Sequence, residues 1–334
     1  MAATIEELLT RCVAAWCPGA AGVIGPTRLS GGASQETWSF DVVHPNGNVG
    51  AILRRAPPGY GAAPSRAAGL NVEAALMRLA DAAGVPSPKV LHVLRPEDEL
   101  GTGFIMARVE GETIPRKILR DQKFVHVRAK LARQCGGVLA AIHGIAQPEW
   151  PELRRMTAET EIAQLEQEYR SFDRPRPVFE LALRWLRDHN PGPSAEVALV
   201  HGDFRHGNLI IGPDGIRAVL DWELAHTGDP MEDLGWICVN SWRFGEIDKP
   251  VGGFGTREEL FAGYQAAGRR VDPARVNFWE VMGTLRWGIM CCGMMQRFRL
   301  GPDHSLERAM IGRRSSETEI DLLRLLAPRG RHAG

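Results

Sequence analysis

The feature that most constrains this sequence is the stretch 197–235, in which polar residues that are costly to bury interrupt short apolar runs at fixed offsets. Two of these runs, Leu209–Ile211 and Ile216–Leu220, are separated by the turn sequence Pro-Asp-Gly at 213–215. Short β-branched runs on either side of a turn predict a β-hairpin. The rest of the chain is expected to support this segment.

Polar side chains flank the predicted hairpin on both sides. Asp203 and Asn208 come before its first strand, and Asp221 follows its second strand. Because a hairpin holds its two ends side by side, these three side chains should converge on one small volume. Phosphoryl transfer from a nucleotide needs one carboxylate near the hydroxyl of the acceptor. It also needs an amide and a second carboxylate near a divalent ion. In that chemistry Asp203 receives the acceptor's proton, while Asn208 and Asp221 hold Mg²⁺ through oxygen atoms.

The spacing within this stretch resembles the catalytic loop of the kinase-like phosphotransferases. Asp203 and Asn208 are five residues apart, and Asp221 follows Asn208 by thirteen. The motifs HGD, GN and DWE, which contain these residues, are similar to those of the aminoglycoside phosphotransferase branch. The run WELAHTGDPMEDLGW, together with LRR before the prolines near residue 57, also resembles the kinase-like domains fused to some acyl-CoA dehydrogenases.

The resemblance implies an α+β fold with two lobes. Residues 1–110 would form a nucleotide-binding lobe of antiparallel sheet, preceded by an amphipathic helix at Ile5–Trp16. Residues 111–327 would form a larger helical lobe for catalysis and acceptor binding, and 328–334 a frayed tail. The cofactors implied are ATP, or another nucleoside triphosphate, and Mg²⁺.

Hydrophobic periodicity supports this division. Residues 23–56 predict three antiparallel strands, Asn71–Ala83 predicts a helix, and Val90–Leu94 and Gly103–Val109 complete a sheet of about five strands. Further helices are predicted at Lys123–Ile145, Ala158–Ser171, Pro177–Asn190, Met231–Asn240, Arg257–Ala267, Pro273–Arg299 and Ser305–Leu326.

Small residues between the first two predicted strands could hold a phosphate. Gly31 and Gly32 allow backbone N–H groups to approach an anion, and Ser30 and Ser34 add hydroxyl donors. An ordinary hairpin loop is the equally acceptable alternative.

Arg54 occupies the position at which the family's strand carries a lysine that binds phosphate. Arginine is permanently charged and binds phosphate through a bidentate fork, so the role is retained with a changed geometry. The family pairs this cation with a helix carboxylate, for which Glu73 is the candidate; an exposed helix charge is the alternative. By position and resemblance, Arg108 and Val109 lie at the hinge between the lobes, where backbone groups would meet the adenine edge.

A metal-dependent hydrolase is an alternative hypothesis for the HxDxxH sequence. Two imidazoles and a carboxylate, from His201, Asp203 and His206, would suit zinc or iron. This hypothesis leaves Asn208 and Asp221 without a role, so phosphoryl transfer is preferred.

The resemblance assigns supporting roles to other residues of the loop. The resemblance implies that Asp233 braces the loop through backbone N–H groups, whereas His201 is expected on its own chemistry to be structural and to tie the loop down through ring hydrogen bonds. Arg205 is a further catalytic candidate beside Asp203. A nucleotide-binding regulator without turnover remains a second alternative.

Aromatic and basic residues of the second lobe are candidates for acceptor binding: Trp242, Arg243, Arg297 and Arg299. Arginines would favour an anionic acceptor, such as a hydroxyacyl thioester of coenzyme A, whereas a polycationic aminoglycoside should require an acidic cleft. Core packing for the aromatic residue and surface salt bridges for the arginines are the alternatives.

Composition excludes several other classes of protein. The 334 residues are 44% apolar, enough for one large core or two moderate ones. The formal net charge is +0 and no basic stripe occurs, which favours a small-molecule partner over nucleic acid or a membrane. Six cysteines without CxxC spacing, and an N-terminus unlike a signal peptide, predict a cytoplasmic protein with reduced thiols.

Overall fold

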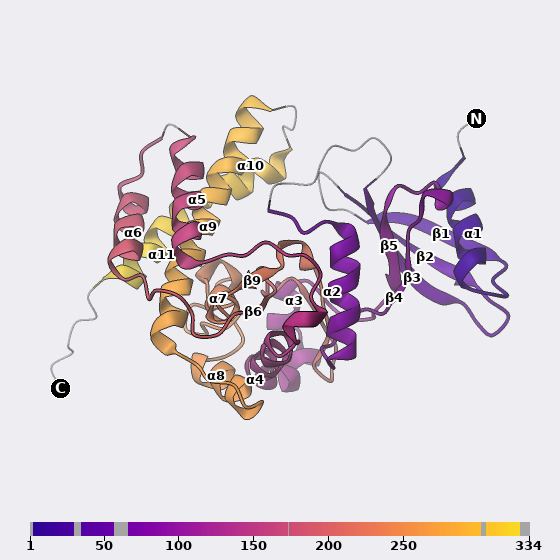
Figure 1. Cartoon of the computed structure of the whole chain (residues 1–334), viewed down its shortest axis with the longest axis horizontal. Coiled ribbons are helices and arrows are strands. Elements are labelled where there is room, and N and C mark those ends of the chain that lie inside the picture. The colour runs from indigo at the N-terminus through magenta and orange to yellow at the C-terminus, as the bar shows by residue number, and fades with distance from the viewer. Residues whose placement is uncertain (1–2, 30–34, 57–65, 173, 302–304, 328–334) are drawn as a thin grey trace.

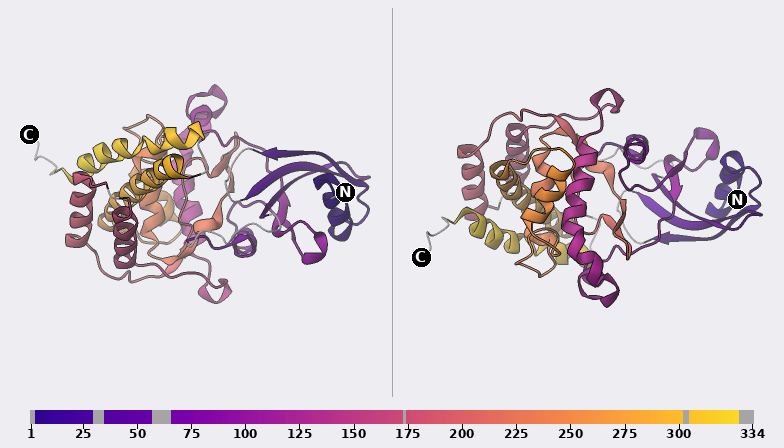
Figure 2. Two further views of the ribbon diagram at one scale, coloured as in Figure 1. Left: turned by 90° about the horizontal axis from the view of Figure 1, so that it is seen from above. Right: turned by 90° about the horizontal axis from the view of Figure 1, so that it is seen from below.

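The computed structural model describes the whole chain except residues 1–2, 30–34, 57–65, 173, 302–304 and 328–334. Figure 1 shows a smaller lobe built on a sheet and a larger, mainly helical lobe beside it. Both views of Figure 2 place the sheet at one end of the molecule and the last helix of the chain at the other. The two-lobed α+β architecture expected from the sequence is therefore confirmed.

The smaller lobe contains one antiparallel sheet of five strands, in the order β1-β2-β3-β5-β4. Its strands are β1 (Gly22–Leu29), β2 (Glu36–Val43), β3 (Val49–Ala56), β4 (Val90–Val93) and β5 (Thr102–Ala107). The predicted strands between 23 and 56 and the total of about five strands are confirmed. β5 lies in the interior of the sheet, next to β3. The end of β5, from which the chain continues to the larger lobe, is therefore beside β3.

Two helices cover opposite faces of this sheet (Figure 1). Helix α1 (Ile5–Trp16) begins at a capping box, in which the Thr4 side chain accepts from the Glu7 N–H and Glu7 accepts from the Thr4 N–H. It packs Leu9 and Val13 against the sheet, so it braces the lobe. Helix α2 (Leu70–Ala82) covers the other face and joins the core of the larger lobe.

The larger lobe contains nine of the described α-helices and two small two-stranded sheets. The helices are α3 (Pro115–Arg120), α4 (Val125–His143), α5 (Ala158–Arg170), α6 (Pro177–Asp188), α7 (Met231–Trp236), α8 (Arg257–Ala266), α9 (Pro273–Leu300), α10 (Leu306–Gly312) and α11 (Ser315–Leu326). The small strands are β6 (Ala198–Val200), β7 (Leu209–Ile211), β8 (Ile216–Val219) and β9 (His226–Gly228).

The prediction of one continuous helix over Ser305–Leu326 is wrong, because the chain turns between α10 and α11. Gly312 ends α10 where it lies against α9: a Cβ at Gly312 would stand 2.8 Å from the Cβ of Met295. The break therefore lets two short helices pack against α9 where one straight helix would diverge from it.

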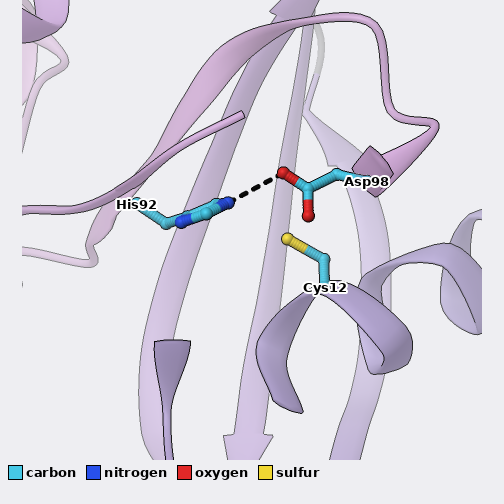
Figure 3. Close-up of side chains that lie close together, drawn as sticks. All are labelled: Cys12, His92 and Asp98. Carbon is cyan, nitrogen blue, oxygen red and sulfur yellow. Dashed lines mark hydrogen bonds and ion pairs between the residues drawn. The ribbon is translucent and has the colours of Figure 1, made fainter. Parts of the chain in front are cut away.

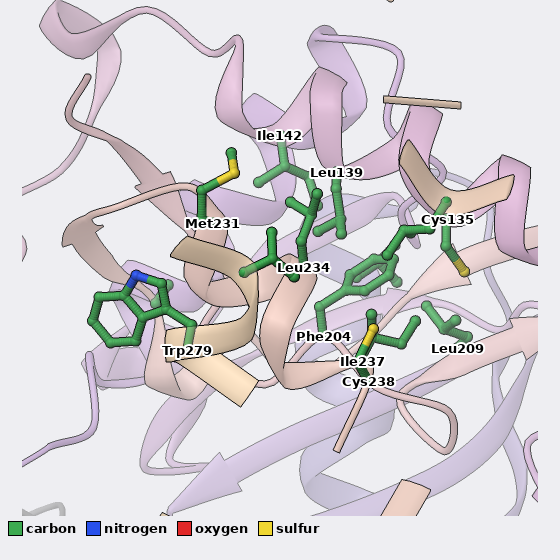
Figure 4. Packing of buried hydrophobic residues seen from close by; sticks show 14 of the residues in the cluster. Cys135, Leu139, Ile142, Phe204, Leu209, Met231, Leu234, Ile237, Cys238 and Trp279 are labelled. Carbon is green, nitrogen blue, oxygen red and sulfur yellow. The ribbon is translucent and has the colours of Figure 1, made fainter. Parts of the chain in front are cut away.

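The core of the larger lobe lies directly beneath the segment 198–236. Figure 4 shows Phe204, Leu209 and Leu234 from this segment packed against Leu139 of α4. All four side chains are fully buried, so the segment is held on a close-packed floor.

Helices α4 and α8 meet at two glycines, which makes this floor dense. A Cβ on Gly136 would lie 2.0 Å from the carbonyl oxygen of Leu260, and one on Gly263 would lie 2.0 Å from that of Arg133. Neither position can carry a side chain without separating the helices.

Across the described part of the chain, we find no helix with both the length and the apolar character needed to span a membrane. The apolar stretch of α9 is instead buried, and it contains Glu280 and Arg286 in ion pairs with other buried or partly buried residues.

Candidate active site

The predicted hairpin is present as β7 and β8, which pair antiparallel from Leu209–Val219 to Ile211–Ile216. At its open end the N–H of Leu220 donates to the carbonyl of Asn208 at 2.8 Å, which places Asn208 next to Asp221. The strand before the hairpin, β6, pairs with β9, and this second pairing was missed from the sequence. The segment that carries the candidate site is thus closed at its base by β6 and β9.

Asp203 lies at the centre of a set of hydrogen bonds. Its Oδ1 accepts from Nε1 of Trp236 at 2.8 Å and from Nε of Arg205 at 3.1 Å. Its Oδ2 accepts from Nδ2 of Asn208 at 2.7 Å. The amide nitrogen of Asn208 is therefore committed to Asp203, which leaves the amide oxygen as the atom able to bind a metal ion.

Asp233 holds the backbone just before Asp203, in the geometry expected for a brace. Its carboxylate accepts from the N–H groups of His201 and Gly202 at 2.8 and 2.9 Å, and from Nε2 of His143 at 3.0 Å. The other ring nitrogen of His143 lies 2.9 Å from the hydroxyl of Tyr264. Burial alone would raise the pKa of Asp233, but the hydrogen bond and charge of His143 hold it below its usual value.

Arg54 joins the two lobes through three carboxylates. Its Nη2 lies 2.8 Å from Asp221 and 3.4 Å from Glu223, and its Nε lies 3.4 Å from Glu73 on α2. The pairing of Arg54 with Glu73 that the resemblance implied is present, although Glu73 is buried and does not lie on the exposed flank of its helix. Asp221 adopts a left-handed backbone conformation, with φ 69° and ψ 61°, which turns its carboxylate toward Arg54.

Comparison with known sequences agrees with this geometry: the sequence profile of the phosphotransferase enzyme family matches residues 26–275, about three quarters of the chain. The chain belongs to the phosphotransferase enzyme family. The matched region includes β3 with Arg54, α2 with Glu73 and the whole segment from β6 to α7.

Curated relatives of this phosphotransferase are named as acyl-CoA dehydrogenases. Acyl-CoA dehydrogenase family member 11 of Gallus gallus is 27% identical over 70% of this chain and 30% of its own length. Acyl-CoA dehydrogenase family member 10 of Mus musculus is 29% identical over 78% of this chain and 26% of its own length. The chain thus spans about a third of the length of the curated relatives it matches.

Solved structures show the same fold. A Ralstonia eutropha structure assigned to the aminoglycoside phosphotransferases is 23% identical, with a TM-score of 0.73 over 96% of this chain and 97% of that one. Aminoglycoside phosphotransferase APH(4)-Ia, in a ternary complex with AMP-PNP and hygromycin B, is 17% identical, with a TM-score of 0.61 over 98% of this chain and 99% of that one. These similarities establish the kinase-like fold of the phosphotransferase.

The charge around Arg54 fits a metal ion. Three carboxyl groups share one guanidinium. Burial, helped by the charges of Asp221 and Glu223 and opposed by that of Arg54, raises the pKa of Glu73 to about 8. Oε1 of Glu73 is buried and has no hydrogen-bond partner. The partly exposed carboxylate of Asp221 and the amide oxygen of Asn208 are ligands of the kind that Mg²⁺ prefers. The donor set therefore fits the divalent ion that phosphotransferases require.

The remaining nucleotide-binding predictions fall in two places. Ser30, Gly31, Gly32 and Ser34 lie outside the described residues. Arg108 turns its guanidinium back to the sheet, 2.7 Å from Asp41 on β2, so only its backbone and that of Val109 remain for a nucleotide. The chain then continues into Glu112, which exchanges two backbone hydrogen bonds with Ile211 of β7.

The structure does not gather His201, Asp203 and His206 into a metal site. Nδ1 of His206 lies 2.6 Å from the carbonyl of Gly252, and Nδ1 of His201 accepts from the Asp203 N–H at 3.2 Å. Burial lowers the pKa of His206 to about 4. The described residues contain one group of three His, Cys, Asp or Glu side chains whose ligand atoms all lie within 4.8 Å of one another. That group lies elsewhere in the fold.

That group is Cys12, His92 and Asp98, in the smaller lobe beneath α1 (Figure 3). Nε2 of His92 lies 2.8 Å from Asp98, whose carboxylate also accepts from the N–H of Arg95 at 2.7 Å. Burial and the charge of Asp98 raise the pKa of Cys12 to about 12, so the thiol stays protonated. The group therefore ties α1 to the loop after β4 through hydrogen bonds.

Trp242 belongs to a cluster of three indole rings next to Asp203. Its ring centroid lies 5.2 Å from that of Trp236 and 4.9 Å from that of Trp287, and the guanidinium of Arg205 lies 4.7 Å over it. Trp236 was missed from the sequence, although it follows Asp233 by three residues and so shares its helix face. The indole N–H groups of Trp242 and Trp287 are buried without a hydrogen-bond partner.

The arginines predicted to bind the acceptor are not together. Arg243 is held by the carbonyl of Cys238 at 2.7 Å and by the buried carboxylate of Glu280 at 2.9 Å. Its counter-charge is thus internal, and the expectation that it needs an anionic acceptor is wrong. Arg297 is exposed on α9, and Arg299 lines a cavity further along the same helix.

Proposed function

We propose that this phosphotransferase transfers the γ-phosphate of ATP, or of another nucleoside triphosphate, to a hydroxyl group of a small molecule. The observation that carries this proposal is the position of Asp203, hydrogen-bonded to Asn208 at the open end of the hairpin that also presents Asp221 to Arg54. A proton acceptor, two oxygen ligands for a metal and a fixed cation are the parts that phosphoryl transfer needs.

Asp203 would orient the acceptor hydroxyl and receive its proton. Its bonds to Trp236 and Arg205 fix the carboxylate before the acceptor arrives, so that little reorganisation is needed during the reaction. Arg205 lies beside Asp203 with its side chain partly exposed, where its charge can meet the transferred phosphoryl group.

Asn208 and Asp221 would hold Mg²⁺, which neutralises phosphate charge when bound. Arg54, positioned by Glu73, would bind phosphate oxygens from the smaller lobe. Residues 30–34 and the backbone at 108–109 are proposed to complete the nucleotide site, with the boundary between the lobes near residue 110.

Among acceptors, we favour a hydroxylated anion, such as a hydroxyacyl thioester of coenzyme A, over an aminoglycoside. Three guanidinium groups lie over the tryptophan cluster: Arg205 over Trp242, Arg286 over Trp236 and Arg314 over Trp287. Each of these guanidiniums is paired with a carboxylate of the chain, Asp203, Glu232 or Glu317, so the preference rests on the apolar aromatic surface beside Asp203, which suits an acyl group better than a polycation. The names of the curated relatives are compatible with an acyl thioester, whereas the solved aminoglycoside phosphotransferase holds hygromycin B.

The test is ADP release from ATP in the presence of hydroxylated anions, neutral alcohols and aminoglycosides, each with the parent protein and with Asp203→Asn. The proposal expects Mg²⁺-dependent release that requires one class of alcohol and Asp203. ATP binding without release from any alcohol would favour the nucleotide-binding regulator. Phosphorylation of aminoglycosides but of no anionic alcohol would overturn the preferred acceptor and leave the reaction class intact.

A further inference from the structure

A cavity of about 410 Å³ opens in the larger lobe, between the end of α5, the last turns of α9 and the junction of α10 with α11. Its volume is within the range of small-molecule sites. Helix α9 lines it with Cys292, Met295 and Arg299, whereas Trp287 and Cys291 of the same helix pack in the tryptophan cluster. The cavity is therefore separate from the site around Asp203.

The charge of this cavity is one-sided. Four arginines line it, Arg174, Arg176, Arg299 and Arg313, and no aspartate or glutamate is among its described lining residues. Arg176 is anchored by Glu319 at 2.8 Å and by the hydroxyl of Ser315 at 3.0 Å. The other three arginines are exposed and, in the described part of the chain, have no carboxylate within 4.0 Å. Among the described residues, the rim thus presents three guanidinium groups that have no carboxylate partner.

The floor of the cavity is apolar. Phe172 and Met295 contribute partly buried side chains, and Leu300 at the rim is 80% exposed. Guanidinium groups bind phosphate through paired hydrogen bonds, and an apolar floor binds a hydrocarbon chain.

We propose that this cavity binds a small amphipathic anion, with a phosphate monoester held by the arginines and an apolar chain lying on Phe172 and Met295. The phosphate of such a ligand supplies a counter-charge to Arg174, Arg299 and Arg313, which have no carboxylate partner in the part of the chain that the structure describes. The inference does not depend on the proposed phosphotransfer, because the cavity shares no residue with the site around Asp203.

The experiment is calorimetric titration of the full chain with dodecyl phosphate, kept below its critical micelle concentration. We expect one site per chain, and at least about tenfold weaker binding in the double variant Arg299→Glu, Arg313→Glu, since two charge-assisted contacts are lost. Arg184→Glu, at an exposed position of α6, makes the same substitution at one site outside the cavity and should bind as the parent does. Met295→Trp, which fills the floor without changing charge, should also weaken binding.

The proposal would be overturned by equal binding of dodecyltrimethylammonium, by unchanged affinity in the double variant and in Met295→Trp, or by a stoichiometry well above one. Inorganic phosphate should bind much more weakly than dodecyl phosphate, because it cannot use the floor. Flotation with phosphatidic acid vesicles distinguishes a lipid surface from a soluble ligand. Binding to vesicles that dodecyl phosphate does not displace would contradict a closed small-molecule site.

Discussion

The loop that carries Asp203 and the cluster around Arg54 lie close together and differ in their charge balance. Beneath the loop, the buried carboxylate of Asp233 is matched by two backbone N–H groups and by His143. Around Arg54, three carboxyl groups face one guanidinium; burial raises the pKa of Glu73 to about 8, and one of its buried oxygens has no hydrogen-bond partner.

This difference separates a part of the site that is already complete from one that is completed on binding. The network of Asp233 satisfies its own charge, so the loop geometry should be independent of ligands. The cluster of Arg54 holds three acidic groups and one guanidinium, and burial raises the pKa of Glu73 to about 8, so the charge of the cluster should respond to metal ions and to phosphates. Each prediction below changes one residue of these two regions.

The largest effect is expected from Asp203→Asn, which removes the proposed proton acceptor between the two regions. Turnover should fall by about 10²-fold or more, the usual scale for a positioned base. Thermal stability and ATP affinity should stay near the parent values, because asparagine keeps the size of the side chain. Steady-state kinetics with an accepted alcohol measures the turnover. Unchanged turnover would show that Asp203 is not the proton acceptor.

His206→Gln tests whether the folded loop region excludes a proton from its buried histidine. The folded pKa of His206 is about 4 because the ring is buried, against 6.5 in the unfolded chain. Between these values the unfolded chain binds a proton that the folded chain does not, so stability falls as pH falls from 6.5 to 4. The parent should lose up to about 3 kcal/mol relative to the variant across this window.

Urea unfolding at several pH values measures this difference. Glutamine can still donate to the carbonyl of Gly252, so the variant should keep the fold. His189→Gln, at the exposed end of α6, is the matched control and should follow the parent curve. Parallel curves for the parent and His206→Gln would contradict the expected pKa.

Asp221→Asn tests the unbalanced cluster by removing one of its three carboxylates. Asparagine tolerates the left-handed backbone at this position, so the charge is changed without strain. The tightening of ATP binding by Mg²⁺ should decrease by about tenfold to hundredfold. Titration of ATP with and without Mg²⁺ measures this tightening. Asp214→Asn, at an exposed position, is the control. An equal Mg²⁺ effect in the parent and both variants would exclude Asp221 from the metal site.

Trp236→Phe should have the smallest effect, since it deletes one hydrogen bond to Asp203 and keeps an aromatic ring in the cluster. The expected loss in kcat is about fivefold, with KM for ATP unchanged. Trp287→Phe is the matched control, because its indole N–H has no partner to lose. Equal kinetics in the two variants would show that Trp236 only packs.

The parts of the fold and site that could be predicted depend on short-range chemistry. The turn at 213–215 and its apolar neighbours were sufficient to predict the hairpin, and the hairpin was sufficient to bring Asn208 beside Asp221. The pairing of Arg54 with Glu73 came from resemblance, because nothing in the local sequence selects Glu73 over another carboxylate.

What was missed depends on long-range partners. The pairing of β6 with β9 and the bond from Trp236 to Asp203 join elements whose spacing carries no local signal. Arg243 was assigned to the acceptor because its partner, Glu280, lies on a distant helix, and periodicity does not reveal which charges meet. The turn between α10 and α11 likewise follows from packing against α9.

The pairing of β6 with β9 has a consequence for how the chain reaches its active form. Because Val200 pairs with His226, the residues between them form one closed loop. The hairpin of β7 and β8 closes a second, shorter loop inside it. The entropy of closing such nested loops grows slowly with length, so most of the cost of placing Asp203, Asn208 and Asp221 is met within one short piece of chain. Contacts of low sequence separation form fast, and this segment should acquire its shape before Arg54 arrives from the other lobe.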